Sequence, residues 1–263
     1  MKKLFFLFAF CWSCAKSSEP KPVSLPDSDD TPLAQTFIKD GYKRVWQDEF
    51  NGTALDLTKW EYRQAGVVRN LGRVAKETVS LDGKGNLVIQ LLKTDGEYKI
   101  GQIGTEKTYK TKYGYYECRA RMNHEPGPHV AFWLQSPTLG KYLNDPVRSG
   151  TEIDIFEYHR KEPTTVHHNL HWDGYGTDHK TTGQKTTTPS IETGFHTFGL
   201  LWTEKEYVFY VDGKETWRTT TAVSNVDEYI ILSLELTGWG GDPAKATLPD
   251  EVVYDYVRVY QKP

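Results

Sequence analysis

The feature that most constrains the fold of this sequence is a series of short segments in which apolar and polar side chains alternate. In residues 116–122 the even positions are apolar, whereas the odd positions are charged. In residues 229–236 one face is aliphatic, and the other carries Ser233 and Glu235. Between residues 42 and 260 we find no long run of apolar residues at helical spacing. Many short strands separated by turns predict an all-β fold, an antiparallel β-sandwich.

The N-terminal residues are typical of an export signal. A basic start at Lys2 precedes the apolar run Leu4–Phe10, which is too short to span a bilayer as a helix. A small residue before Cys14 is typical of a lipoprotein processing site, although an ordinary signal peptide is the alternative. We therefore expect a signal peptide at residues 1–13, a lipid on Cys14 and a flexible tether at residues 14–36. The expected location is outside the cytoplasm, anchored by lipid to a bacterial membrane on its cell-surface or periplasmic side.

Charge and cysteine content exclude several classes of protein. The net charge of −3 over 263 residues lacks the basic footprint of a nucleic-acid-binding protein. Past Cys14 only Cys118 remains, so neither an intrachain disulfide nor a cysteine zinc site is expected in the folded part. The 8 Trp, 16 Tyr and 11 Phe suit a core or a surface on which flat, hydroxylated ligands stack. We expect a monomer.

Three carboxylates fall within six residues of one predicted strand: Glu152, Asp154 and Glu157. Glu152 and Asp154 point to the same face, and a one-residue bulge at Ile155–Phe156 would return Glu157 to it. Two carboxyl groups roughly 5–5.5 Å apart are the reacting pair of retaining glycosidases. Crowded like charges raise pKa values, and we expect Glu157 to hold the proton. The alternatives are a solvated strand face or a calcium loop, although the central glycine of a hand-type calcium loop is absent.

The motif Glu152-Ile-Asp-Ile-Phe-Glu157 resembles the bulged signature of glycoside hydrolase family 16. Further segments are similar to the family's strands, in the same order: Trp46–Phe50, Lys112–Met122, Ala131–Leu134, Phe195–Trp202, Tyr210–Gly213 and Asp255–Tyr260. The resemblance implies a concanavalin-like β-jelly-roll with a concave substrate cleft, and a catalytic domain at residues 37–263.

The resemblance also implies roles for the three carboxylates. Glu152 would be the nucleophile, Asp154 its helper and Glu157 the acid/base, in a retaining reaction that requires no metal or organic cofactor. Several family members carry a structural calcium ion, for which Glu49 and Asp255 would be the ligands here.

Three further residues are candidates for sugar binding. Trp133 matches a family tryptophan near the cleavage point, with a core aromatic as the alternative. His171 fits a family histidine near the sugar, with a core or exposed histidine as the alternative. Trp239 lies in a glycine-rich segment where the family places cleft-edge residues, and a loop tip is its alternative. His167 and His171 share a strand face, which is a weaker indication of zinc.

Departures from the family pattern leave the sugar open. Before Phe132-Trp133, where β-1,3-glucanases have Trp-Pro-Ala, this chain has Pro-His-Val-Ala at residues 128–131, and residues 136–148 form an insertion. The leading expectation is an endo-acting glycosidase that cleaves a β-1,3- or mixed-linkage β-glucan. The alternative is an endo-β-galactanase acting on agar, porphyran, carrageenan or keratan/mucin-type glycans, for which Arg69, Arg73 and Arg148 are candidate basic residues. A catalytically silent carbohydrate-binding lipoprotein is the alternative from another class.

Overall fold

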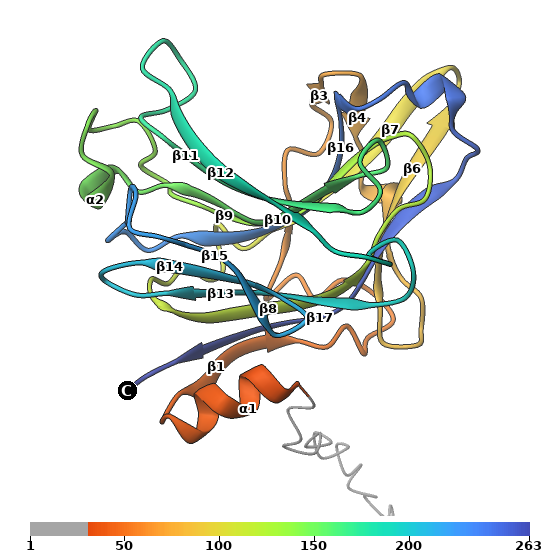
Figure 1. The fold of residues 1–263 in the computed structure, drawn as a ribbon. Helices are drawn as coiled ribbons and strands as arrows, with labels where there is room; N and C mark the ends of the chain where they lie inside the picture. The colour runs from red at the N-terminus through yellow and green to blue at the C-terminus, as the bar shows by residue number, and fades with distance from the viewer. Residues whose placement is uncertain (1–30) are drawn as a thin grey trace, which may run out of the picture.

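The computed structural model describes residues 31–263 (Figure 1). The expected signal peptide at residues 1–13 and the expected lipid on Cys14 therefore lie outside the described residues, as does most of the expected tether at residues 14–36. Within the described part of the chain, no helix combines the length and the apolar character needed to cross a membrane.

One layer of the fold, which we call the back sheet, is antiparallel. Its order is β5–β6–β17–β8–β13–β14–β15, with β1 also paired to β17. The bounds are β1 (Lys43–Asp48), β5 (Val79–Leu81), β6 (Leu87–Thr94), β8 (Gly114–Arg121), β13 (His196–Trp202), β14 (Tyr207–Val211), β15 (Lys214–Thr219) and β17 (Asp250–Gln261).

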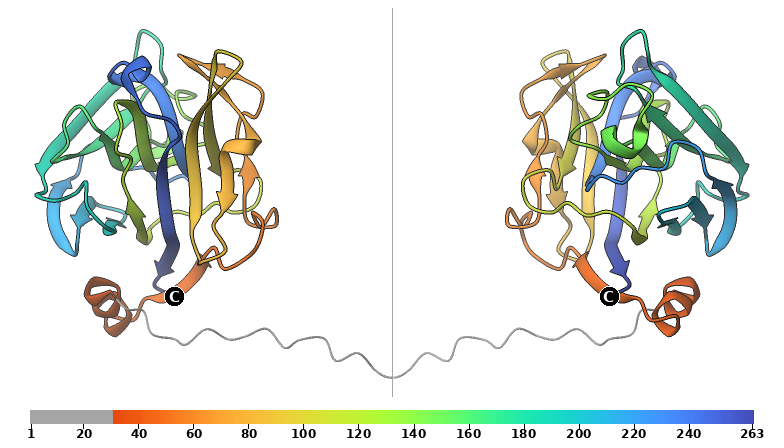
Figure 2. Two further views of the ribbon diagram at one scale, coloured as in Figure 1. Left: turned by 90° about the vertical axis from the view of Figure 1, so that its right-hand side faces the viewer. Right: turned by 90° about the vertical axis from the view of Figure 1, so that its left-hand side faces the viewer.

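The second layer, which we call the cleft sheet, has the order β2–β7–β16–β9–β10–β11–β12. Its strands are β2 (Glu61–Tyr62), β7 (Glu97–Gly104), β9 (Gly127–Gln135), β10 (Glu152–His159), β11 (Thr165–Trp172), β12 (Lys180–Thr187) and β16 (Tyr229–Gly240). The short strands β3 (Val68–Arg69) and β4 (Gly72–Val74) flank it, and β4 runs parallel to β7. The hairpin β6–β7 links the two layers, which Figure 2 shows from both sides. The expected antiparallel β-sandwich is confirmed.

The predicted alternation decides which side chains form the core. Tyr116, Cys118, Ala120 and Met122 are all fully buried between the layers. The aliphatic face of residues 229–236 joins the same core, so its opposite face is available to the cleft.

Helices are few in the described residues. Helix α2 (Pro146–Ser149) and the 3₁₀ turns η1 (Lys76–Thr78) and η2 (Pro243–Lys245) are each a single turn. Helix α1 (Pro32–Lys39) crosses the boundary expected between residues 36 and 37, so residues 32–36 are helical where a flexible tether was expected. The cause is packing on the back sheet, where Phe37 stacks on Tyr115 with ring centroids 4.3 Å apart.

Candidate active site

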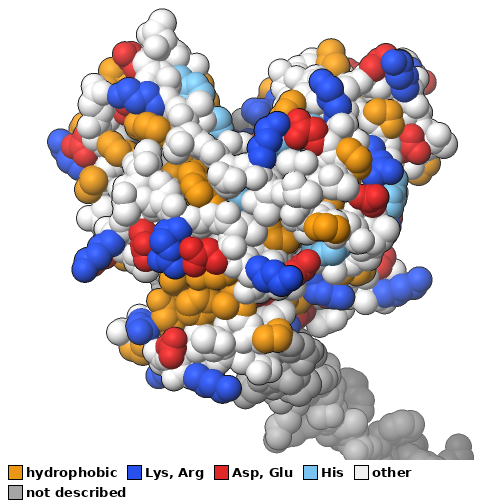
Figure 3. Space-filling view, viewed as in Figure 1, with side chains coloured by type: hydrophobic (Ala, Val, Ile, Leu, Met, Phe, Trp, Pro, Cys, Tyr) orange, Lys and Arg blue, Asp and Glu red, His pale blue; other side chains and the backbone are white. Residues whose placement is uncertain are grey.

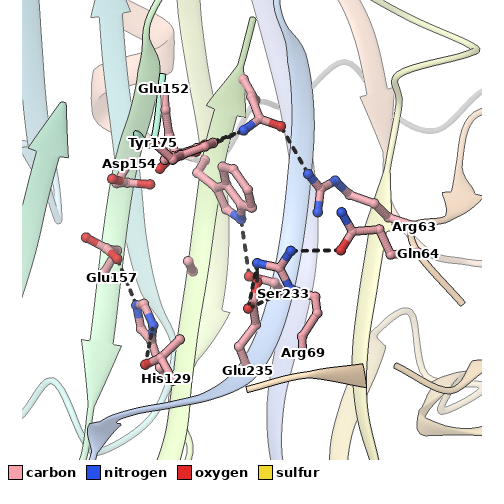
Figure 4. A pocket seen from close by; sticks show the side chains of 14 residues that line it. Arg63, Gln64, Arg69, His129, Glu152, Asp154, Glu157, Tyr175, Ser233 and Glu235 are labelled. Atoms are coloured by element: carbon pink, nitrogen blue, oxygen red, sulfur yellow. Dashed lines mark hydrogen bonds and ion pairs between the residues drawn. The ribbon is translucent and has the colours of Figure 1, made fainter. Parts of the chain in front are cut away.

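Strand β10 carries the three carboxylates, and its bulge is present. In its pairing with β11, Glu152 faces His171 and Glu157 faces His167, and the register shifts between Asp154 and Glu157. The pairing with β9 shifts between Asp154 and Phe156. This extra residue turns Glu157 to the same side as Glu152 and Asp154, as the sequence predicts (Figure 4).

A cleft of about 410 Å³ lies over this face of the cleft sheet, and Figure 3 shows the surface hollowed there between two lobes. Its floor comes from β9, β10 and β16, and includes Trp133, Ser233 and Glu235 beside the three carboxylates. Arg63 and Arg69 line it from the side of β2 and β3.

Neutral donors surround Glu152. The amide of Gln135 donates to one of its carboxylate oxygens over 3.0 Å, and the hydroxyl of Tyr175 donates to the same oxygen. Burial, and next the negative charge of Asp154, raise the pKa of Glu152 to about 8. The free site therefore disfavours a charge on Glu152.

The surroundings of Glu157 lower its pKa, whereas those of Glu152 raise the pKa of that group. Nε2 of His129 lies 2.8 Å from one carboxylate oxygen of Glu157, and the amide of Asn169 donates to the other. Burial alone would raise the pKa of Glu157, but the hydrogen bond and charge of His129, together with Asn169, lower it. Burial alone would likewise lower the pKa of His129, but Glu157 raises it above its ordinary value.

The directions of these two pKa shifts run against the expectation that Glu157 holds the proton in the free site. They favour a proton on His129 and an ionised Glu157. Asp154 is buried, and burial followed by the charges of Glu157 and Glu235 raises its pKa well above the ordinary value. The free site therefore keeps its carboxyl protons on Glu152 and Asp154.

The three candidate sugar-binding residues take different positions. Trp133 lies in the cleft floor, where its indole nitrogen donates to Ser233 over 3.2 Å and the guanidinium of Arg63 lies 5.3 Å from its ring. His171 lies 3.4 Å from a carboxylate oxygen of Asp154. Trp239 packs edge to face on three histidine rings, those of His129, His159 and His167.

The residues expected to bind calcium are held by arginines. Glu49 accepts two hydrogen bonds from Arg258, at 2.8 and 2.9 Å, and Asp255 forms an ion pair with Arg119. In residues 31–263 two other groups of side chains bring metal-ligating atoms together: Glu152, Asp154 and His171; and His159, Glu162 and His167. The calcium site stays a prediction.

Of the three candidate basic residues, the structure brings one into the cleft. Arg69 lines it and forms an ion pair with Glu235, 3.1 Å apart. Arg73 binds Glu97 outside it, and the guanidinium of Arg148 lies over the Tyr142 ring.

Sequence reasoning did not identify several residues that contact the three carboxylates or line the cleft beside them. Tyr175 lies in the connection after β11, and Arg63 follows β2, so neither shares a motif with β10. Gln135 ends β9, immediately after the segment that resembles the family. His129 was visible only as a departure from the family pattern.

Comparisons with known proteins agree with this fold. The GH16 domain of β-porphyranases A–D matches residues 44–262. Glucan endo-1,3-β-glucosidase A1 of Niallia circulans is 27% identical over 93% of this chain, and endo-1,3-1,4-β-glycanase EglC of Rhizobium meliloti is 28% identical over 88%. The chain spans 41% and 52% of the length of these two relatives. The crystal structure of SCLam, a non-specific endo-β-1,3(4)-glucanase, superposes with a TM-score of 0.72 at 32% identity, covering 85% of this chain and 92% of that one. The chain therefore belongs to glycoside hydrolase family 16.

Proposed function

We propose that this protein is a retaining, endo-acting glycoside hydrolase that cleaves internal β-linkages of a polysaccharide, with a β-1,3- or mixed-linkage β-glucan as the leading substrate. The observation that carries the proposal is the bulged strand β10, which places Glu152, Asp154 and Glu157 on the floor of an open cleft. The glucan is supported by the similarity to glucan-cleaving relatives. An open cleft suits attack inside a chain, because both ends of the polymer can extend beyond it.

In the proposed reaction Glu152 attacks the anomeric carbon and Glu157 protonates the departing oxygen. Water then displaces Glu152 from the covalent glycosyl-enzyme, with Glu157 as the base. Glu152 must be ionised to attack, so its proton has to leave when the sugar binds. Asp154 lies between the two glutamates on β10 and holds a proton in the free site, so it can donate a hydrogen bond to the ionised Glu152, whose own proton leaves to solvent.

The His129–Glu157 pair supplies the proton in this scheme. Nε2 of His129 and a carboxylate oxygen of Glu157 lie 2.8 Å apart, which is hydrogen-bonding distance, so the pair can share one proton and behave as one acid. Asn169 holds the other oxygen of Glu157 and fixes the direction of the carboxylate. His129 stands where β-1,3-glucanases have a Trp-Pro-Ala segment, so the His129–Glu157 pair is a feature in which this chain departs from the pattern of those enzymes.

A β-galactan is the second candidate substrate. The matching family is that of β-porphyranases, and Arg63 and Arg69 both line the cleft. Guanidinium groups recognise anionic substituents such as sulfate through paired hydrogen bonds. Both arginines already have partners in the chain, Gln102 and Glu235, so an anionic sugar would have to compete with them.

Export, and anchoring of the enzyme through a lipid on Cys14, remain part of the proposal. Palmitate labelling that disappears in Cys14→Ala would support them, and labelling that is unchanged would contradict them.

The experiment is product profiling of the full chain on laminarin, barley β-glucan, agarose, porphyran and keratan sulfate. We expect internal cleavage of one of these classes, products that are released with the β configuration, and a loss of kcat of more than ~10³-fold in Glu152→Gln. Glu251→Gln is the control, because Glu251 lies on the back sheet, where it pairs with Arg121 at 3.1 Å.

Products released with the α configuration would contradict retention, and turnover that persists in Glu152→Gln would contradict the nucleophile. Binding without cleavage of any glycan would instead support a silent carbohydrate-binding protein. In Glu157→Ala, azide should rescue turnover of an activated aryl glycoside, because azide needs no base to attack the glycosyl-enzyme.

A further inference from the structure

Among the described residues, two buried histidines near the three carboxylates have ring nitrogens without a hydrogen-bond partner. His159 is 0% exposed, and neither of its ring nitrogens has a hydrogen-bond partner within residues 31–263. Nε2 of His167, which is 3% exposed, also lacks a hydrogen bond there. A buried polar group without a partner is unfavourable, because it loses its hydrogen bonds to water and gains none in return, so these nitrogens call for a ligand from outside the chain.

The hairpin β10–β11 brings a carboxylate to the same two rings. The backbone N–H of Glu162 donates to the carbonyl of His159 over 3.2 Å, and Thr165 N–H donates to the carbonyl of Glu162 over 3.0 Å. This turn places a carboxylate oxygen of Glu162 3.4 Å from Nε2 of His167. One ligand atom from each of His159, Glu162 and His167 lies within 4.8 Å of the other two.

Strand register explains why the two histidines meet. His167 is paired with Glu157 across β10 and β11, and its side chain lies on the same face of the sheet. His159 follows Glu157 by two residues, so its side chain returns to that face. The bulge that aligns the carboxylates therefore also aligns the histidines.

We propose that His159, Glu162 and His167 bind a divalent transition-metal ion, with Zn²⁺ as the best fit. Two imidazole nitrogens, one carboxylate oxygen and a fourth position for water are a ligand set typical of zinc. Ca²⁺ and Mg²⁺ fit poorly, because they require mostly oxygen ligands at six or more positions.

The surroundings determine how an ion reaches the site. The Trp239 ring covers His159 and His167, with centroids 4.5 and 4.6 Å away, and shields that side from water. The Glu162 side chain is 35% exposed, so the ion enters past it. Lys185 forms an ion pair with Glu162 at 3.0 Å and competes with the metal for this carboxylate.

The test is titration of the chelator-treated, untagged full chain with Zn²⁺ by calorimetry, and with Co²⁺ by visible absorption. We expect one ion per chain and the absorption of a four-coordinate Co²⁺ with nitrogen ligands. Glu162→Gln and His167→Gln should each weaken binding by at least ~10-fold. Lys185→Met should tighten it, because a competing cation is removed.

Two controls locate the ion. Glu152→Gln alters the other group of ligands, Glu152, Asp154 and His171, and should leave Zn²⁺ affinity unchanged. Glu251→Gln on the back sheet should also leave it unchanged. Thermal unfolding of the metal-free variants verifies that each is folded, and Glu162, which is partly exposed, is the variant least able to disturb the core.

The proposal is overturned if no Zn²⁺ or Co²⁺ binds, since the nitrogens would then be satisfied by water alone. Binding that is lost in Glu152→Gln but kept in Glu162→Gln would overturn it as well, because the ion would then lie among the catalytic carboxylates.

Discussion

Two carboxylates behind the core of this sandwich and two in its cleft have opposite surroundings. Glu49, which directly follows β1, is held by Arg258, and Glu251 on β17 is held by Arg121, so each of these two negative charges faces a guanidinium. On the cleft sheet, Glu152 has an amide and a phenol as partners, and its near neighbour Asp154 is another carboxylate. The cleft face thus holds Glu152 and Asp154, which repel one another when both are ionised, although Glu235 on the same face is paired with Arg69. Repulsion costs stability, and it also keeps pKa values within reach of proton transfer.

The first prediction is that removing a charge has opposite effects on stability at the two faces. Glu49→Gln leaves the buried guanidinium of Arg258 without its carboxylate, which should lower the free energy of unfolding by about 2–3 kcal/mol. Glu152→Gln should instead raise it at pH 8. Denaturant unfolding of both variants and the wild type measures the difference.

The stabilisation expected for Glu152→Gln depends on pH, and the direction of that dependence follows from the pKa of Glu152. The pKa of Glu152 is raised to about 8 in the folded chain, from an ordinary value of 4.5. Below pH 4.5 the carboxyl is neutral in both states, and above pH 8 the folded state carries the unfavourable charge, so wild-type stability is lost between these values. The full pKa shift of Glu152 corresponds to about 5 kcal/mol in the free energy of unfolding. Partial exposure of Glu152 and its sharing of protons with Asp154 reduce the stabilisation that we expect for Glu152→Gln at pH 8 to about 2 kcal/mol. A Glu152→Gln protein less stable than wild type at pH 8 would contradict this.

The second prediction concerns two histidine–carboxylate pairs. His129→Gln in the cleft should lower kcat on the polysaccharide by about 10- to 100-fold, because Glu157 loses its proton source. An aryl glycoside with a good leaving group should lose much less, and the pKa of Glu157 in the pH–rate profile should rise. His196→Gln, which breaks the pair with Asp212 (2.7 Å) on the back sheet, should leave both rates unchanged. An equal loss on both substrates in His129→Gln would point to disturbed binding instead.

The third and smallest expected effect concerns two glycines that make room for side chains. A Cβ on Gly183 would lie 2.0 Å from the side-chain oxygen of Asn169, so Gly183→Ala should displace Asn169 from Glu157 and lower kcat by about 10-fold. A Cβ on Gly199 would lie 2.6 Å from the Tyr115 hydroxyl on the back sheet, so Gly199→Ala should lower Tm and leave kcat unchanged. Gly176→Ala is the control, since no atom lies within 4 Å of its Cβ. If Gly183→Ala lowered Tm and spared kcat, Asn169 would not position Glu157.

Sequence patterns predicted what depends on neighbouring residues in the chain. The faces of residues 116–122 follow from the two-residue period of a strand, and the bulge in β10 follows from the spacing of Asp154 and Glu157. Both depend on a few residues, and both are present in the structure.

Contacts between distant segments were not predictable in the same way. The pKa of Glu157 is set by His129, which lies on a neighbouring strand, and Tyr175 reaches Glu152 from a connection. Helix α1 is short and follows a segment rich in proline and serine, and it is stabilised because Phe37 stacks on Tyr115. In each case tertiary packing outweighs local propensity.

The position of α1 has a consequence for how the enzyme could be presented to its substrate. This helix lies against the back sheet, whereas the cleft opens on the opposite side of the molecule (Figures 1 and 3). Whatever precedes Pro32 therefore joins the domain from behind. If Cys14 carries a lipid as proposed, the mouth of the cleft can face away from the membrane that holds the protein. A polymer much longer than the protein can then cross the cleft without meeting the lipid anchor.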